Sequence, residues 1–224
     1  MRVNADFRQR AAVHAGEVPW QASPTPGVER RMLDRVGEEQ ARATSIVRYA
    51  PGSRFPRHSH PGGEEILVLE GVFQDEHGDF PAGSYLRNPP GSAHAPGSEP
   101  GCTILVKLRQ FDQEDRAQVR LDTNGMDYRP VSNGAGVERM DLFRGMGEEV
   151  RLERWPPGQR VEEALPGGME AFVLAGGFRE GSEEFGLHGW LRLPAGEALD
   201  ATAGPEGCEL WVKVGHLGGS LAGE

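Results

Sequence analysis

The sequence contains only two cysteines, Cys102 and Cys208, and they are far from any CxxC spacing. Neither a disulfide framework nor a thiolate zinc finger is therefore indicated. Long apolar runs are also missing, since no window approaches the roughly 20 apolar residues needed to cross a bilayer. The first residues, MRVNADFRQRAAVHAG, include no apolar segment of signal-peptide length, so we expect a soluble, cytoplasmic protein.

Basic residues are in deficit. The chain carries 24 lysines and arginines against 34 acidic residues, which gives a formal net charge of -10. A negatively charged protein is repelled by a phosphate backbone and by an anionic membrane surface. We therefore expect neither nucleic acid nor membrane among its partners.

Uninterrupted helices have little room, because 32 glycines and 17 prolines punctuate the 224 residues. The apolar segments at 44–50, 65–69, 84–87 and 102–108 have strand length, and the stretches of chain between them contain Gly, Pro and Asp. Helix propensity alone would allow a helix over 29–39, but Gly37 interrupts that segment. The pattern predicts an all-β protein of many short strands.

The chain repeats itself with an offset of about 105 residues. The matching blocks are GVERRMLDRVGEEQARATSIVRYAPG (27–52) with GVERMDLFRGMGEEVRLERWPPG (136–158), PGGEEILVLEGVF (61–73) with PGGMEAFVLAGGF (166–178), and GCTILVKL (101–108) with GCELWVKV (207–214). The lead-ins RAAV at Arg10 and RAQV at Arg116 also agree. We predict two domains, 1–115 and 116–224.

Two histidines, His58 and His60, stand two residues apart ahead of an apolar run. In a strand they project to the same face, and the Pro-Gly-Gly turn that follows lets Glu64 face back toward them. His94, in NPPGSAHAP, is the best candidate for a fourth ligand, and Glu65 is the substitute for Glu64 if the turn is one residue looser. Imidazole and carboxylate suit a divalent first-row metal without choosing among zinc, iron, manganese and nickel.

This pattern resembles the two cupin motifs. The first motif is matched by Gly52, His58, His60, Glu64 and Gly71, and the second by Gly83, Pro89, Gly91 and His94, with Ser98 where the motif usually ends in Asn. More narrowly, residues 44–111 resemble the cupin domain of ChrR-like anti-sigma factors. The second repeat resembles this domain more weakly.

The resemblance implies two tandem cupin barrels, each a double-stranded β-helix or jelly roll. It also implies one divalent ion in the first barrel, bound by His58, His60, Glu64 and His94. Zinc is the expected ion, because it is typical of ChrR-like cupins, and iron, manganese and nickel are the alternatives. ChrR holds its sigma factor through a separate domain with a His-x3-Cys-x2-Cys pattern, which is missing here. The resemblance therefore does not carry anti-sigma activity, or a sigma-factor partner, over to this chain.

The second repeat has lost the ligand pattern. Met169 replaces Glu64 and Leu199 replaces His94, while Ala164 and Leu165 lie near the positions of the two other histidines. We expect all four positions to be apolar and this barrel, a degenerate cupin domain, to hold no metal. Lys107 and its counterpart Lys213 are interpreted as edge-strand lysines that reach solvent.

Two functions stay open at the level of sequence. The resemblance to ChrR-like cupins implies a metal-dependent module that binds a small molecule in an oxidant or stress response. The alternative is a metal-dependent enzyme, such as an acetylacetone-type dioxygenase or an isomerase. No second carboxylate or Ser-His pair near the motif identifies a general base, so the sequence assigns no reaction. A homodimer formed by strand exchange near the amino terminus is compatible with the pattern.

Overall fold

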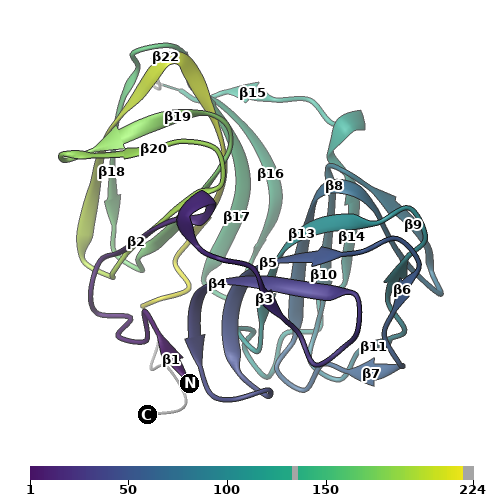
Figure 1. Cartoon of the computed structure of the whole chain (residues 1–224). Coiled ribbons are helices and arrows are strands. Elements are labelled where there is room, and N and C mark those ends of the chain that lie inside the picture. The colour runs from purple at the N-terminus through teal and green to yellow at the C-terminus, as the bar shows by residue number, and fades with distance from the viewer. Residues whose placement is uncertain (133–135, 219–224) are drawn as a thin grey trace. The chain divides into compact units, whose positions relative to one another are not determined.

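The computed structural model of the chain describes residues 1–132 and 136–218, and its strands are antiparallel throughout (Figure 1). Among these residues the helical segments are two short 3-10 turns, η1 (Ala15–Glu17) and η2 (Thr123–Gly125). The described residues contain no helix long and apolar enough to cross a membrane. The predicted all-β class is confirmed, including a strand where propensity alone would allow a helix, β4 (Val28–Val36).

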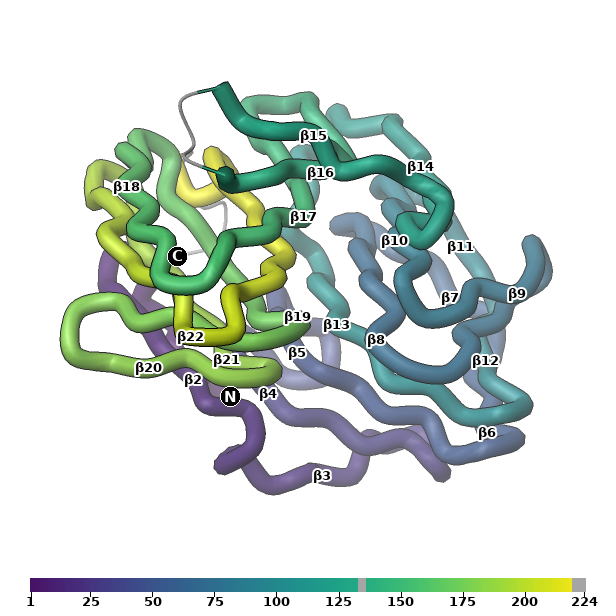
Figure 2. Tube along the Cα trace, turned by 90° about the horizontal axis from the view of Figure 1, so that it is seen from above, coloured from purple at the N-terminus to yellow at the C-terminus, as the bar shows by residue number. Residues whose placement is uncertain are grey.

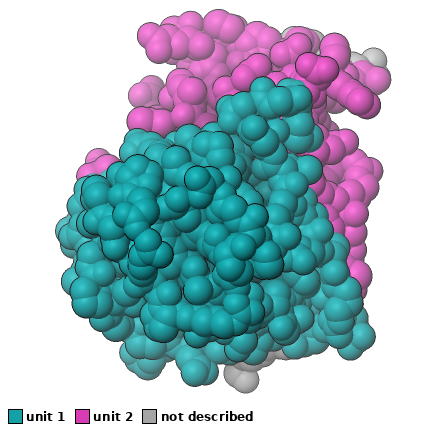
Figure 3. Space-filling model, turned by 90° about the vertical axis from the view of Figure 1, so that its right-hand side faces the viewer, with its two compact units in different colours: residues 1–5, 18–126 teal, residues 6–17, 127–224 magenta. Residues whose placement is uncertain are grey.

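The chain divides into two compact units, coloured separately in Figure 3. Unit 1 consists of residues 1–5 and 18–126, and unit 2 of residues 6–17 and 127–224. Each unit is a barrel built on its own antiparallel sheet, so the predicted tandem of two β-barrels is confirmed.

Unit 1 is built on a sheet with the strand order β1-β4-β5-β13-β8-β10-β14, and β7 and β11 form a separate pair. Its further strands are β1 (Arg2–Val3), β3 (Gln21–Ala22), β5 (Arg42–Tyr49), β6 (Ser53–Arg54), β7 (His58–Ser59), β8 (Glu64–Asp75), β9 (Gly78–Pro81), β10 (Ser84–Asn88), β11 (Ala93–His94), β12 (Gly97–Ser98), β13 (Cys102–Leu108) and β14 (Val119–Asp122).

Strand β13 occupies the centre of this sheet, between β5 and β8. Its register aligns Ile104 with Val47 and Val68, so apolar side chains of three strands meet on one face. The core also contains aromatic residues from neighbouring strands, among them Tyr49 and Phe73. This core forms the wall against which the polar site described below is placed.

Unit 2 has the order β15-β16-β17-β22-β19-β21-β2. Its strands are β2 (Ala11–His14), β15 (Arg129–Pro130), β16 (Glu138–Gly145), β17 (Glu148–Trp155), β18 (Arg160–Leu165), β19 (Met169–Glu180), β20 (Glu183–Phe185), β21 (Gly189–Leu193) and β22 (Glu197–Val214). The order β16-β17-β22-β19-β21 repeats β4-β5-β13-β8-β10 of unit 1, as the self-similarity of the sequence predicts, whereas β15 takes the place of β3 rather than that of β1.

The outermost strand of each main sheet comes from the lead-in segment of the other repeat. In unit 1, β14 pairs with β10, and in unit 2, β2 pairs with β21, which Figure 2 shows side by side. The strands β14 and β2 thus occupy equivalent edges with exchanged partners. Val119 and Ala11 are the residues opposite the equivalent Arg87 and Arg192, so this pairing is shifted by two residues from the match of RAAV with RAQV. The domain boundary after residue 115 stays a prediction, because the spatial units interleave at the amino terminus.

The interpretation of Lys107 and Lys213 as lysines that reach solvent is wrong. Both lie on central strands, β13 and β22, with exposed fractions of 1% and 0%. The Nζ atom of Lys107 donates to Oγ1 of Thr44 at 2.9 Å, and Nζ of Lys213 lies 3.0 Å from Glu148. A buried ammonium group is tolerated when such partners replace water.

Candidate metal centre

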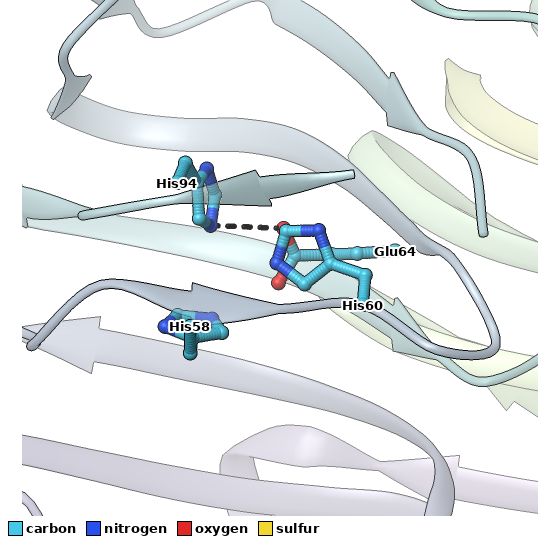
Figure 4. Close-up of side chains that lie close together, drawn as sticks. All are labelled: His58, His60, Glu64 and His94. Carbon is cyan, nitrogen blue, oxygen red and sulfur yellow. Dashed lines mark ion pairs between the residues drawn. The ribbon is translucent and has the colours of Figure 1, made fainter. Parts of the chain in front are cut away.

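Two short strands place two of the candidate ligands opposite each other. In the antiparallel pair of β7 and β11, His58 is the cross-strand partner of His94, so the two side chains lie on the same face. His60 follows β7, and its backbone N–H donates to the carbonyl of Ser92 at 2.9 Å. Glu64 begins β8 after the predicted turn, and Figure 4 shows the four side chains converging.

The distances within this group are those of a compact cluster. One ligand atom from each of His58, His60, Glu64 and His94 lies within 4.8 Å of all the others. Oε2 of Glu64 is 3.5 Å from Nε2 of His60 and 3.3 Å from Nε2 of His94. Glu64, His60 and His94 are buried, whereas His58 is half-buried. The structure therefore brings together all four residues that the sequence singled out.

Each of the three imidazoles forms a hydrogen bond through its Nδ1 atom. Nδ1 of His58 lies 3.1 Å from the carbonyl of Pro56, Nδ1 of His60 lies 3.0 Å from Oγ of Ser92, and Nδ1 of His94 lies 3.1 Å from Asp75. A carbonyl or a carboxylate accepts, so Nδ1 carries the proton in His58 and His94, and Nε2 keeps its lone pair. The rings of His58 and His94 are thus fixed in the tautomer that a metal needs.

The inner nitrogens have no other partner. Nε2 of His60 and Nε2 of His94 are buried and accept no hydrogen bond among the described residues. A buried polar atom without a partner costs free energy, about 1–3 kcal/mol, unless a bound group satisfies it. Two such lone pairs beside a buried carboxylate, which accepts from Nδ2 of Asn88 at 3.1 Å, suit a divalent metal ion.

Local charges shift the pKa values of these groups in opposite directions. Burial lowers the pKa of His60 below its usual value, and the charge of Glu64 only partly offsets this. Burial also disfavours charge on His94, but the hydrogen bond to Asp75 and the charge of Glu64 outweigh it and raise the pKa of His94. For Asp75, the hydrogen bonds from His94 and the backbone of His77 outweigh burial and lower the pKa. The carboxylates thus make the His94 imidazole more basic, which strengthens it as a ligand.

The alternative ligand Glu65 lies on the opposite face of β8. Its Oε1 accepts a hydrogen bond from the hydroxyl of Tyr85 at 2.7 Å, and its Oε2 lies 3.9 Å from Arg87. Because side chains alternate along a strand, Glu64 and Glu65 cannot both face the histidines. Glu64 is therefore the carboxylate of the cluster.

The expectation that all four equivalent positions of the second repeat are apolar is wrong at one of them. The pairing of β18 with β22 sets Glu163 opposite Leu199, as His58 is set opposite His94 in unit 1. Glu163 therefore occupies the place of His58, and its Oε2 lies 2.7 Å from the buried guanidinium of Arg151. The one-residue deletion hid this correspondence. Among the described residues, unit 2 contains no group of three or more potential ligands close enough to hold a metal.

A cavity of about 340 Å³ adjoins the cluster. His58, His60 and Glu64 line it, together with apolar side chains of β5 and β13. A small molecule in this cavity would contact the face of the cluster that the protein leaves open.

Sequence reasoning missed the residues that support the cluster. Asp75, Asn88 and Ser92 each hydrogen-bond one of the four candidate ligands. Their distance from those ligands in the chain ranges from 19 to 32 residues, so no local spacing signals the contacts. These contacts depend on how the strands pair in the folded barrel.

Two comparisons with known proteins concern the sequence of the chain. Residues 8–112 match the family model described as the ChrR cupin-like domain. A search of the curated proteins finds no match to the chain.

Several solved structures share the fold. A candidate dioxygenase from Nostoc punctiforme is 18% identical with a TM-score of 0.76, and the alignment covers 96% of this chain and 85% of that one. The protein Ylba from Escherichia coli is 15% identical with a TM-score of 0.70, covering 94% and 93%. Oxalate decarboxylase from Lactobacillus farciminis is 11% identical with a TM-score of 0.65, covering 92% and 86%. At these identities the likeness concerns the fold.

Proposed function

We propose that the chain is a ChrR-like bicupin of the cupin superfamily and that its first barrel binds one divalent metal ion through His58, His60, Glu64 and His94. The ion is zinc in this proposal, with iron, manganese and nickel as the alternatives. The second barrel is structural. The observation that carries the proposal is the pair of buried, unpartnered Nε2 atoms facing the Glu64 carboxylate.

The proposed role is to bind a small molecule at the metal, in an oxidant or stress response. When bound, the ion would act as a Lewis acid or, if it is iron, activate oxygen. The chain's own contribution is to fix the imidazole tautomers, to provide the adjoining cavity and to bury Glu64 and His94 away from water. Binding at the metal requires no group for proton transfer, and the sequence offers none near the motif.

The first experiment is metal analysis of the purified protein. We expect about one zinc ion per chain for the wild type, and a loss of most of it in His94→Ala, because the buried site then lacks one imidazole. His77→Ala is the matched control, since His77 is exposed and lies outside the cluster. A wild-type protein that retains no ion above trace, or a His94→Ala variant that retains a full equivalent, would contradict the proposal.

A metal-dependent enzyme is the second candidate, favoured by the cavity beside the cluster. Three imidazoles and one carboxylate leave one or two positions of a six-coordinate ion free for substrate or O2. If the chain is an iron dioxygenase, the Fe(II) protein will consume O2 with β-diketones, and His94→Ala will not. A zinc-bound protein without turnover in the same panel supports the binding role instead.

A further inference from the structure

The cavity that adjoins the cluster is rich in positive charge. Besides apolar walls from Val47, Ile104 and Val106, its lining contains Arg30, Arg35 and Arg109. The acidic residues in the lining are Glu39 and Glu64, and Glu64 belongs to the metal cluster. A protein with a net charge of -10 thus lines this cavity with three guanidinium groups. Clefts of one sign attract ligands of the other.

Arg35 is the most buried of the three arginines. Its exposed fraction is 3%, and the register of β4, β5, β13 and β8 sets it in one cross-strand row with Ala43, Leu108 and Glu64. Residues of such a row project to the same face, so Arg35 points to the side of the sheet on which Glu64 lies. Its guanidinium donates to the carbonyl of Glu38 and, in the described part of the chain, forms no ion pair.

Arg30 is only partly neutralised. Its guanidinium lies 3.1 Å from Glu39, whose side chain is 62% exposed, and its Nε is buried without a hydrogen-bond partner among the described residues. Burial lowers the pKa of Arg35, and the nearby charge of Arg30 lowers it further. A buried guanidinium, that of Arg35, next to a half-buried one, that of Arg30, whose carboxylate partner Glu39 is mostly exposed to solvent, favours a bound anion.

The second repeat shows what the same positions do when the chain supplies the anion. By register, Arg139 corresponds to Arg30, and it pairs with Glu153 at 2.7 Å, where unit 1 has Val47. Arg144 corresponds to Arg35 in the same way.

Arg144 also finds its carboxylate within the chain. Its Nη2 lies 2.8 Å from Glu149, at the position that Ala43 occupies in unit 1, although the Arg144 side chain is 71% exposed whereas Arg35 is buried. The repeat without the metal cluster therefore provides internal carboxylates for both arginines. The repeat with the metal cluster replaces them by small or apolar residues and leaves a cavity.

We propose that the ligand of the first barrel carries a carboxylate, which binds Arg30 and Arg35, in addition to the oxygens that coordinate the metal. The inference rests on the proposed function and names the chemical class of its ligand. Arg35 and Glu64 stand three strand spacings apart, at most about 14 Å along the sheet. Their side chains shorten this gap, so a chain of a few carbon atoms spans it, with its methylene groups against the apolar wall.

The test compares two probes that differ only in that charge. Succinylacetone is a β-diketone with a carboxylate at its far end, and its methyl ester is the neutral counterpart. Zinc-loaded protein is titrated with each by calorimetry, because zinc permits binding without turnover. We expect the carboxylate to bind at least about tenfold more tightly than the ester, as charge-assisted hydrogen bonds to guanidinium groups predict.

Substitutions in the cavity test whether Arg30 and Arg35 cause the preference for the carboxylate over the ester. Arg30→Gln and Arg35→Gln are expected to bring the affinity ratio close to one with little change for the ester. Glu39→Gln is expected to tighten binding of the carboxylate, because it removes the competing anion. Arg54→Gln is the matched control, since Arg54 is exposed, outside the cavity lining and ion-paired with Glu99. If Arg35→Gln does not fold, Arg30→Gln and Glu39→Gln still decide the matter.

The outcomes separate this inference from the metal proposal. Suppose that the protein binds one equivalent of zinc. Equal affinities for the two probes, or no binding of either probe, would then overturn the carboxylate site and leave the metal centre intact. An affinity ratio that is unchanged by both arginine substitutions would do the same. Failure to retain zinc overturns the metal centre itself.

Discussion

At the scale of single residues, the geometry of the candidate metal site depends on the hydrogen-bond acceptors of the imidazole Nδ1 atoms as much as on the four candidate ligands. Asp75, at the carboxyl end of β8, accepts from Nδ1 of His94 at 3.1 Å and raises the pKa of that histidine. Nothing in the spacing of the cupin motifs points to Asp75, because its contact with His94 arises from the curvature and pairing of the barrel. The ligands were predictable from sequence, whereas this positioning residue was not.

Asp75→Ala is therefore expected to weaken zinc binding about 10- to 100-fold, the usual cost of losing the partner that orients a ligating histidine. Competition with a chromophoric chelator measures the affinity. Asp79→Ala is the control, because Asp79 is an exposed acceptor for Gln74 that lies outside the cluster. Equal zinc affinities for Asp75→Ala and wild type would show that the Asp75 carboxylate does not position His94.

At the scale of elements, the longest strand of unit 1 bends at a glycine of the first cupin motif. Gly71 has φ +70°, and a Cβ atom there would lie 2.1 Å from the carbonyl oxygen of Gly101. Gly176 in unit 2 has φ +65° and the same close approach to Gly207. The repeated blocks of sequence therefore preserve a backbone requirement even where the ligands have been lost.

Gly71→Ala is expected to reduce the free energy of unfolding by more than about 2 kcal/mol, because left-handed strain adds to a clash with backbone that has no room to move. Urea denaturation followed by circular dichroism measures the change. In Gly125→Ala, an added Cβ meets nothing within 4 Å, so this control should remain close to wild type. A Gly71→Ala variant as stable as the control would mean that β8 and β13 can separate at this bend without cost.

At the scale of the whole molecule, the interleaved units determine how the chain can be divided. A fragment of residues 1–115 lacks β14, which leaves the edge of β10 unpaired. A fragment of residues 18–126 contains all strands from β3 to β14 and all four candidate ligands. Unpaired edges expose backbone groups and apolar surface and favour aggregation.

We expect the fragment 18–126 to have the higher melting temperature and to bind one equivalent of zinc, while the fragment 1–115 aggregates or melts earlier. Differential scanning fluorimetry and gel filtration of the two fragments test this. A higher melting temperature for the fragment 1–115 than for the fragment 18–126 would place the domain boundary at residue 115, as the repeat pattern by itself suggests.

Metal removal is expected to act on the stability of the full chain. A ligand that binds only the folded state stabilises it by about 4 kcal/mol when its free concentration is 1,000 times Kd. Addition of a chelator should therefore lower the melting temperature of the wild type, and His94→Ala should show no further decrease. An unchanged melting temperature in chelator would count against a tightly held ion.

The sequence by itself determined the all-β class, the internal repeat and the grouping of His58, His60, Glu64 and His94. These features depend on local spacing, on the period of two along a strand and on turn residues, and all three can be recognised in the sequence. The burial of Lys107 is a different case. It follows from the position of β13 between two other strands, which no local pattern reveals.

Only the tertiary structure decided which lead-in strand completes which barrel, that Glu163 takes the place of His58, and that Arg30 and Arg35 line the same cavity as the candidate ligands. The physical reason is that cross-strand register joins residues far apart in sequence. A single deletion, as in the second repeat, changes which side chain occupies a position without altering the surrounding motif.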